Sequence, residues 1–144
     1  MRISQLMSKQ VVSITPEESA ALAARLLARH DLGLLPVCAQ DGALVGVVTD
    51  RDIVVRCLAA GAEPSRVPVA DIMSPAPHTA QPEEPAEDAL RRMARLQVRR
   101  LPVVEQGQVV GMVSLGDLAR SRRYEMESAK ALGEISANVR RHRR

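Results

Sequence analysis

The sequence predicts an α/β (α+β) fold of two pseudo-symmetric repeats, each a short helix followed by β-α-β-β-α, with a C-terminal helical extension. The first observation behind this prediction is a duplication, since Pro36 and Pro102 occupy the same place in two similar stretches of the chain. The second is composition: with one Tyr and no Phe or Trp, the core must be aliphatic. The third is the presence of short Val- and Leu-rich runs, which are typical of strands. A fixed repeat period determines the architecture before any single element is assigned.

Three pairs of motifs are separated along the chain by the same number of residues as Pro36 and Pro102. They are Leu6-Met7-Ser8 with Ile72-Met73-Ser74, Thr15-Pro16-Glu17 with Gln81-Pro82-Glu83, and Leu35-Pro36-Val37 with Leu101-Pro102-Val103. In a fourth pair, Gly46–Asp52 with Gly111–Asp117, the offset is smaller by one, so one turn of the second copy is shorter. A duplicated unit implies a duplicated site. We divide the chain into repeat 1 (1–60), a linker rich in Pro and Gly (61–68), repeat 2 (69–120) and a basic C-terminal helix or tail (121–144).

In the first copy, Thr15 is the expected N-cap of a helix that runs to about residue 30, with Pro16 at its first position. Gly33 is the expected C-cap of that helix. Strands are expected over 34–38 and 43–49, because the Asp-Gly pair between them favours a hairpin turn. A second helix opens at Thr49 or Asp50 and runs to about residue 60.

The second copy repeats this order, with a strand near 78–80, a helix over 83–96, strands over 100–104 and 109–113, and a helix from 115. Each copy alone has a small sheet with one uncovered apolar face. We therefore expect the two copies to pack as one globule.

Composition also excludes several classes of protein. No run of about 18 apolar residues exists, so we expect no membrane span, and the N-terminus has no apolar signal stretch, which favours the cytoplasm. Cys38 and Cys57 have no metal-ligand spacing, and Cys38 is expected to be a small buried hydrophobe. A Ser/His/Asp set and a phosphate-cradling glycine loop are both missing, and the three histidines are far apart. We expect no enzyme, no catalytic residue and no metal site.

The repeated heptad is the strongest functional signal. It places a hydroxyl residue, Thr49 or Ser114, at a strand-to-helix junction and a carboxylate, Asp52 or Asp117, one turn later. A carboxylate can accept both ribose hydroxyls, while a hydroxyl and first-turn amides suit a phosphate oxygen. The alternative is simple N-capping, with the Asp residues favouring the helix dipole. Recurrence in both copies favours ligand binding.

These motifs together resemble a pair of cystathionine β-synthase (CBS) domains, the Bateman module. The resemblance covers about residues 1 to 120 and is carried by Leu6-Met7-Ser8 and Asp71-Ile72-Met73-Ser74, the Leu-Pro-Val strands, Val-Val-Gly-Met-Val-Ser and Gly-Val-Val-Thr-Asp-Arg-Asp-Ile. It is nearest to stand-alone bacterial CBS-pair proteins, including those of the hypoxic-response kind.

The resemblance implies a pseudo-two-fold disc with two clefts between the copies, each able to hold an adenine nucleotide. Asp52 and Asp117 would hold the ribose, Thr49 and Ser114 would meet the phosphate, and backbone would bracket the adenine near Ile14, Leu35, Thr79 and Leu101. AMP or ATP is the foremost ligand, with ADP, NAD or an S-adenosyl compound as alternatives, and no covalently bound cofactor is expected. The family also implies a homodimer.

Basic residues near these motifs suggest that the two clefts are unequal. In the family, a basic pair before Leu-Pro-Val reaches the phosphate held mainly by the other copy. Arg99 and Arg100 occupy that place in copy two, where copy one has Gly33-Leu34. The cleft around Thr49 and Asp52 should therefore bind phosphate better, unless the pair is simply solvated at a helix end. Arg51 could reach a phosphate or pair with neighbouring acids.

The C-terminal segment carries the net charge of the chain. Residues 120–144 hold eight Lys or Arg and three acids, which leaves 12 basic and 14 acidic residues in 1–119. An apolar stripe of Met126, Ala129, Leu132, Ile135 and Val139, which Gly133 interrupts, predicts a helix that packs on its own globule or on a partner. The terminal cluster 140–144 could contact nucleic acid through phosphates or be a solvated end.

The interpretation that we favour is a non-catalytic signal-transduction module that senses adenine nucleotides and reports occupancy to an unidentified protein partner. The alternative is a structural or interaction protein with vestigial clefts, whose basic tail contacts nucleic acid or another protein.

Overall fold

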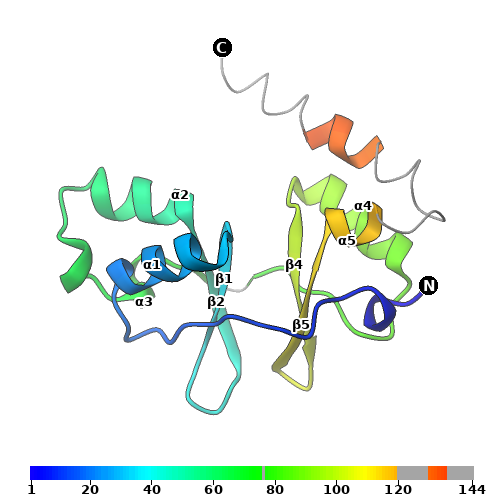
Figure 1. Cartoon of the computed structure of the whole chain (residues 1–144), viewed down its shortest axis with the longest axis horizontal. Helices are drawn as coiled ribbons and strands as arrows, with labels where there is room; N and C mark the ends of the chain where they lie inside the picture. The colour runs from blue at the N-terminus through cyan, green and yellow to red at the C-terminus, as the bar shows by residue number, and fades with distance from the viewer. Residues whose placement is uncertain (76, 120–129, 136–144) are drawn as a thin grey trace. The chain divides into compact units, whose positions relative to one another are not determined.

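The computed structural model of the protein describes residues 1–75, 77–119 and 130–135 (Figure 1). Its contacts divide the chain into two compact units. We call them the Thr49 unit, which comprises Val12–Pro77 and Gln106–Val109, and the Ser114 unit, which comprises Met1–Val11, His78–Glu105 and Val110–Arg144. The fold mixes helices and strands and contains both repeats, as the sequence predicts.

The Thr49 unit is a small sheet flanked by helices. Its elements are α1 (Ala20–His30), β1 (Leu34–Cys38), β2 (Leu44–Thr49), α2 (Asp50–Asp52), the π-helix η2 (Ile53–Leu58), the 3-10 turn η3 (Pro64–Arg66), α3 (Val69–Ile72) and β3 (Ser74–Pro75). β1 and β2 form an antiparallel hairpin in which Leu34 lies opposite Thr49, and β3 adds to the other edge of β2. The hairpin register thus places Thr49 at the end of the sheet, where α2 begins.

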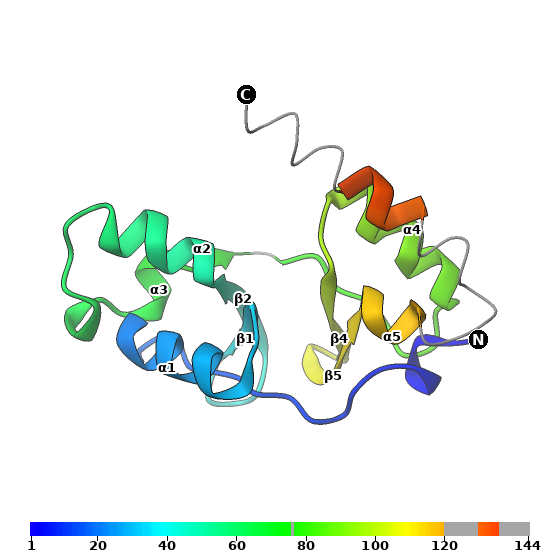
Figure 2. The same ribbon diagram turned by 45° about the horizontal axis from the view of Figure 1, so that its top comes forward.

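The Ser114 unit repeats this arrangement. It contains the 3-10 turn η1 (Ile3–Gln5), α4 (Ala86–Leu96), β4 (Arg100–Glu105), most of β5 (Gln108–Ser114) and α5 (Leu115–Ala119), and residues 130–135 are helical. Figure 2 shows α4, α5 and the helical residues 130–135 together in this unit. Each unit also has one parallel bridge beside its Leu-Pro-Val strand, Ile14 to Val37 and Ala80 to Val103.

Each unit has its own aliphatic core. In the Thr49 unit the core includes Ala23, Leu27, Leu35, Val37, Val48, Ile53, Cys57 and Ile72. In the Ser114 unit it includes Ile3, Leu90, Met93, Leu101, Val103, Val113, Leu118 and Ile135. Cys38, which we expected to be buried, is only half-buried, whereas Cys57 is fully buried.

The opening segments of the two repeats are exchanged between the units. Residues 1–11 belong to the Ser114 unit, where the Ile3 amide donates to the Glu84 carbonyl (3.0 Å) and Ser8 pairs with Met112 of β5. Residues 67–75 belong to the Thr49 unit, where the Ala20 amide donates to the Val67 carbonyl (2.8 Å). A compact unit is therefore not the same stretch of chain as a sequence repeat.

This exchange explains why both long helices begin later than the sequence predicts. α1 begins at Ala20 rather than near Thr15, and its N-cap is Ser19, whose hydroxyl accepts from the Leu22 amide (3.1 Å). The carbonyls of Pro16 and Glu18 accept bonds from Ala70 and Val69 of the exchanged segment, so they are not available to start a helix. α4 begins at Ala86 rather than 83 for the same reason, since Pro82 and Glu84 accept from Ser4 and Ile3.

Three smaller predictions also need correction. α1 ends at His30 as expected, but its C-cap is Asp31, which adopts the left-handed conformation (φ 53°), and not Gly33. The strand expected near 78–80 is a single bridge at Ala80. The helix expected over 50–60 is a short α2 followed by η2, in which the Ala59 amide reaches back to the Val54 carbonyl (2.8 Å).

The helical residues 130–135 pack on their own unit through Ala131 and Ile135, which are 2% and 5% exposed. Leu132, predicted to lie on the buried stripe, is 38% exposed. Ile135, which is also on that stripe, is buried as predicted, but Leu132 is not, because residues four apart share a helix face and the residue paired with Ile135 is Ala131. Met126, Ala129, Val139 and the basic cluster 140–144 lie outside the described residues.

Candidate functional site

Thr49 and Asp52 form a reciprocal pair at the junction between β2 and α2. The Thr49 hydroxyl accepts from the Asp52 amide (3.1 Å), and the Asp52 carboxylate accepts from the Thr49 amide (3.0 Å) through Oδ2. Asp52 is 8% exposed, and its Oδ1 lies 3.9 Å from Nε of Arg56, whose own guanidinium donates to the Ile72 and Met73 carbonyls. The local fold is thus a capping box.

Ser114 and Asp117 form the same pair between β5 and α5. The Asp117 amide donates to the Ser114 hydroxyl (3.1 Å), and the Ser114 amide donates to Oδ2 of Asp117 (2.9 Å). Asp117 is partly exposed, unlike Asp52. The N-capping role that we weighed as the alternative is therefore what both pairs do in this structure.

Capping leaves part of each pair available for chemistry. Because the Thr49 and Ser114 hydroxyls accept from an amide, their protons are free to be donated, for example to a phosphate oxygen. The Asp52 carboxylate uses Oδ2 for the cap, its Oδ1 lies 3.9 Å from Nε of Arg56, and a carboxylate has about four acceptor sites in all. Each junction can thus offer a hydroxyl donor beside an anionic acceptor, a combination that suits a sugar phosphate.

The apolar residues predicted near an adenine are core residues. Ile14, Leu35 and Leu101 are 2%, 0% and 1% exposed, so their side chains cannot meet a ligand without repacking. Their backbone is already paired in the same way in both units. The Ile14 amide donates to the Pro36 carbonyl (3.1 Å), and the Ala80 amide donates to the Pro102 carbonyl (2.9 Å). Only the outward backbone of these segments can bracket a base.

The predicted basic residues all lie on the surface. Arg51 is exposed, and its amide donates to the Asp50 carboxylate (2.8 Å). Arg99 and Arg100 are exposed, and the Arg99 carbonyl accepts from the Leu115 amide (2.9 Å), which places Arg99 beside the Ser114 junction of its own unit. The predicted role of this pair toward a ligand of the other repeat stays a prediction.

The ion pair of Arg92 and Glu84 is not among the features predicted from the sequence. Nη1 of Arg92 lies 2.7 Å from Oε2 of Glu84, and Nη2 donates to the carbonyl of Thr79 (2.6 Å), one of the predicted adenine neighbours. A comparison of the two copies could have found it, because Leu26 is the counterpart of Arg92 on the corresponding helix of the first copy. A charge that replaces a leucine on a core-facing helix is a usable signal.

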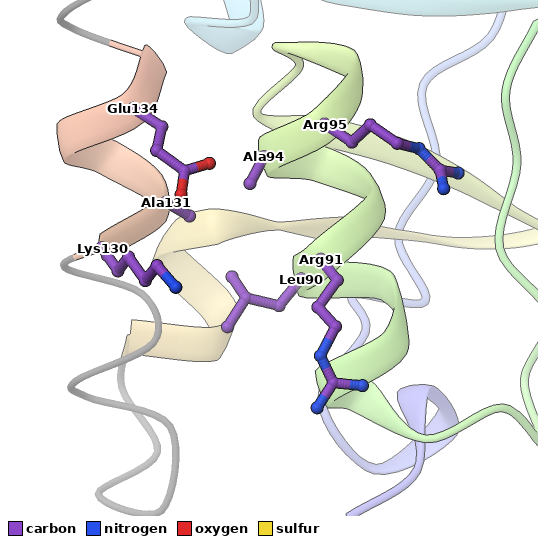
Figure 3. Close-up of a pocket in the computed structure, with 7 residues that line it drawn as sticks. All are labelled: Leu90, Arg91, Ala94, Arg95, Lys130, Ala131 and Glu134. Atoms are coloured by element: carbon purple, nitrogen blue, oxygen red, sulfur yellow. The ribbon is translucent and has the colours of Figure 1, made fainter.

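Among the residues that the structure describes, each unit has a hollow on its surface. The larger lies between α4 and the helical residues 130–135 and is lined by Leu90, Arg91, Ala94, Arg95, Lys130, Ala131 and Glu134 (Figure 3). The other lies in the Thr49 unit and is lined by Ala24, Leu27, Ala28, Asp31, Leu32, Asp50, Ile53 and Val54. None of the predicted site residues lines either hollow.

Two features of the described residues bear on other functions. No three His, Cys, Asp or Glu side chains in that part of the chain lie close enough together to hold a metal ion. None of its helices is both long and apolar enough to cross a membrane.

The duplicated sheet-and-helix units and their matching hydroxyl–carboxylate junctions define a tandem-repeat module, and comparison with known proteins identifies the family. The CBS domain family matches residues 3–58 and 69–124, so this chain belongs to it. A similar relative is the CBS domain-containing protein YhcV of Bacillus subtilis, 39% identical over 134 residues that cover 93% of this chain and 94% of the relative.

Two solved structures with similar folds contain adenosine ligands. The CBS domain pair of protein MJ0100, solved with 5-methylthioadenosine and S-adenosyl-L-methionine, has a TM-score of 0.74, 28% identity, and coverage of 83% of this chain and 94% of that one. CBSX2, solved in complex with AMP, has a TM-score of 0.73, 28% identity, and coverage of 83% and 93%. Both of these proteins thus bind adenosine-containing ligands.

Proposed function

We propose that this chain is a non-catalytic regulatory CBS pair that binds an adenosine-containing ligand, with AMP or ATP foremost. Thr49 and Asp52 form one binding site and Ser114 and Asp117 the other. In each, the carboxylate accepts from the ribose hydroxyls and the hydroxyl donates to a phosphate oxygen. No covalently bound cofactor takes part.

The observation that carries this proposal is the duplicated junction. Both copies build the same reciprocal pair, with four hydrogen bonds between 2.9 and 3.1 Å, although the first turns of α2 and α5 differ in sequence between the paired residues. Capping alone needs only one short polar residue at the N-cap. Retention of both partners in both copies supports a shared task beyond capping, and the adenosine ligands of the two solved neighbours support its chemistry.

Binding becomes a signal when the ligand has different affinity for two states of the module. The ligand then shifts their populations, and a partner that prefers one state reads the shift. We propose that the readers are a second copy of this chain and a further protein that the sequence does not identify. The predicted preference of phosphate for the Thr49–Asp52 site, through Arg99 and Arg100, belongs to this proposal.

A candidate surface on which a second molecule of this protein could dock lies in the Thr49 unit. Val54, Val55 and Leu58 of η2 are 54%, 48% and 52% exposed, and Val54 also lines the hollow formed with Leu27 and Ile53. The corresponding positions of the second repeat hold Ala119, Arg120 and Arg123. The apolar surface is therefore a feature of one repeat and not a requirement of the fold, which supports a task in assembly.

The proposed function is tested by calorimetric titration of the protein with AMP, ATP, NAD and S-adenosylmethionine. Saturable binding by at least one of them is expected. A chain that ends at Ile135 is the control for the alternative function of the tail, because this chain keeps the buried Ala131 and Ile135 but loses the basic cluster. We expect the shortened chain to bind as the full chain does. Lack of binding by all four ligands would favour the tail and its partners as the seat of function.

A further inference from the structure

Arg92 connects three parts of the Ser114 unit. It projects from α4, its guanidinium contacts both oxygens of Glu84 (2.7 and 2.9 Å), and Nη2 also donates to the Thr79 carbonyl (2.6 Å). The side chains of Arg92 and Glu84 are only 28% and 17% exposed. Glu84 in turn accepts from the Gln81 amide (3.0 Å), so the whole turn from Thr79 to Glu84 is fixed to α4.

The backbone held in this way belongs to the candidate site. Ala80, the next residue after Thr79, bridges to Val103 of β4, with its amide bonded to Pro102 and its carbonyl to Val104. Thr79 therefore lies at the edge of the Leu-Pro-Val strand, which is where the base of an adenosine ligand is expected. If the Thr79 carbonyl were not held by Arg92, the ligand itself would have to order this backbone. That ordering would lower the affinity for the ligand.

The first copy lacks this restraint. Its equivalent of Arg92 is Leu26, which has no hydrogen-bonding group and packs against the core of the Thr49 unit. Its equivalent of Glu84 is Glu18, which accepts from the Thr15 amide (3.1 Å) as Glu84 does from the Gln81 amide, and accepts from the Thr15 hydroxyl (3.0 Å) where Glu84 pairs with Arg92. The two candidate sites thus have matching hydroxyl–carboxylate junctions, but the backbone that is expected to contact the base is restrained differently in each.

We propose that Arg92 is a positioning residue, which preorganises the Thr79–Ala80 backbone for the base of a ligand held by Ser114 and Asp117. The inference rests on the proposed function. It implies that the two sites differ in how they hold the base of a ligand. This difference is independent of the one expected at the phosphate from Arg99 and Arg100. A guanidinium suits the task because its planar fork bonds the carboxylate and the carbonyl together, and a lysine offers only a compact point charge.

The first experiment needs no ligand. Hydrogen exchange of the Ala80 amide is measured in the wild type, in Arg92→Leu, in Arg92→Lys and in Arg95→Leu, which removes an exposed cation from the same helix. Arg92→Leu and Arg92→Lys should speed exchange at Ala80 about tenfold, while Arg95→Leu leaves it unchanged. Unchanged exchange in both Arg92 variants would overturn the inference.

The second experiment measures AMP affinity in two backgrounds, Asp52→Ala and Asp117→Ala, each of which keeps one proposed site. Arg92→Leu should weaken AMP binding about five- to tenfold in the Asp52→Ala background and leave it unchanged in the Asp117→Ala background. Arg92→Lys should show the same selective loss while it keeps most of the thermal stability, because the charge pair with Glu84 survives.

A merely structural role for Arg92 would give a different pattern. Equal loss of affinity in both backgrounds, or full affinity in Arg92→Lys, would overturn the inference and leave the proposed function intact. A wild-type chain that binds no AMP would instead overturn the proposed ligand and this inference with it.

Discussion

Thr49 and Asp52 cap each other across the start of α2, with each side chain bonded to the backbone amide of the other. Ser114 and Asp117 repeat the relationship in the second copy. A pair of this kind stabilises the local fold and presents polar groups at the helix end, so stability and binding are coupled in the same residues.

Because Asp52 caps α2, substitutions at Asp52 should lower the stability of the protein. Asp52→Ala should lower the free energy of unfolding by about 1 kcal/mol, because it removes the acceptor for the Thr49 amide. Asp52→Asn, whose amide oxygen can still accept, should lose about half as much. Asp50→Ala is the control, because Asp50 is an exposed acid of the same turn outside the reciprocal pair. Urea unfolding measures all three, and equal losses for Asp50→Ala and Asp52→Ala would contradict the capping role.

Two glycines allow the exchanged segments to lie close to the hairpins. A Cβ at Gly46 would lie 2.9 Å from the Ser74 carbonyl oxygen, and one at Gly111 would lie 2.8 Å from that of Ser8. Gly46→Ala and Gly111→Ala should therefore each destabilise the protein by about 1 to 3 kcal/mol, since backbone cannot move aside as a side chain can.

Gly133→Ala is the matched control for these variants. Gly133 is helical, and a Cβ there has no atom within 4 Å, so alanine should be neutral or stabilising by up to about 1 kcal/mol. Thermal melts of the three variants test the prediction. Wild-type stability of Gly46→Ala and Gly111→Ala would show that the exchanged segments do not pack as described.

The C-terminal helical residues should contribute to stability through Ile135. Ile135→Ala removes a side chain that is 5% exposed in the core of the Ser114 unit, and we expect a loss of about 2 to 4 kcal/mol. Leu132→Ala, at a position 38% exposed, should cost less than about 1 kcal/mol. Denaturant titration gives both values, and a reversed order would favour the apolar stripe that the sequence alone predicts.

The ion pair of Glu84 and Arg92 should make stability depend on pH. Burial by itself raises the pKa of Glu84, but the hydrogen bonds from Arg92 and the Gln81 amide and the Arg92 charge outweigh burial and lower the pKa. A carboxylate with a lowered pKa stabilises the fold above its unfolded value of about 4.3, and this contribution is lost as pH falls through the folded pKa. The melting temperature of the wild type should thus be higher than that of Glu84→Gln at neutral pH. This difference should shrink in acid.

Melting curves between neutral pH and about pH 3 test this dependence on acid. Glu87→Gln, which removes a half-exposed charge from the first turn of α4, controls for general charge effects. A difference between the wild type and Glu84→Gln that does not change with pH would contradict the assigned pair.

The apolar surface of η2 should hold two copies together. The double variant Val54→Lys and Leu58→Lys places charges at residues that are half-exposed in the single chain, so it should fold normally and sediment as a monomer. Leu132→Lys, at an exposed position of the Ser114 unit, should leave the dimer intact. A wild type that sediments as a monomer, or a double variant that remains dimeric, would exclude this surface as the dimer contact.

The hairpins were predictable because their signals are local. β1 spans Leu34–Cys38, as the apolar run before the Asp-Gly turn predicts, and the heptads predicted both junctions. The helix starts were not predictable, because the carbonyls of Pro16 and Glu18 bond to residues of the distant segment 67–75. Arg92 and Ala131 were missed for related reasons: one acts through the Thr79 carbonyl, and the other is a small residue whose burial depends on the facing helix.

The central claim is that the duplicated junctions bind an adenosine ligand, and calorimetric titration of AMP into the wild type and into the double variant Asp52→Ala and Asp117→Ala tests it most directly. The double variant must first show a cooperative melt, since capping alone predicts a loss of about 1 kcal/mol at each site. The account predicts saturable binding by the wild type and none by the folded double variant. Equal binding by both proteins would show that the ligand lies elsewhere and that the junctions only cap helices.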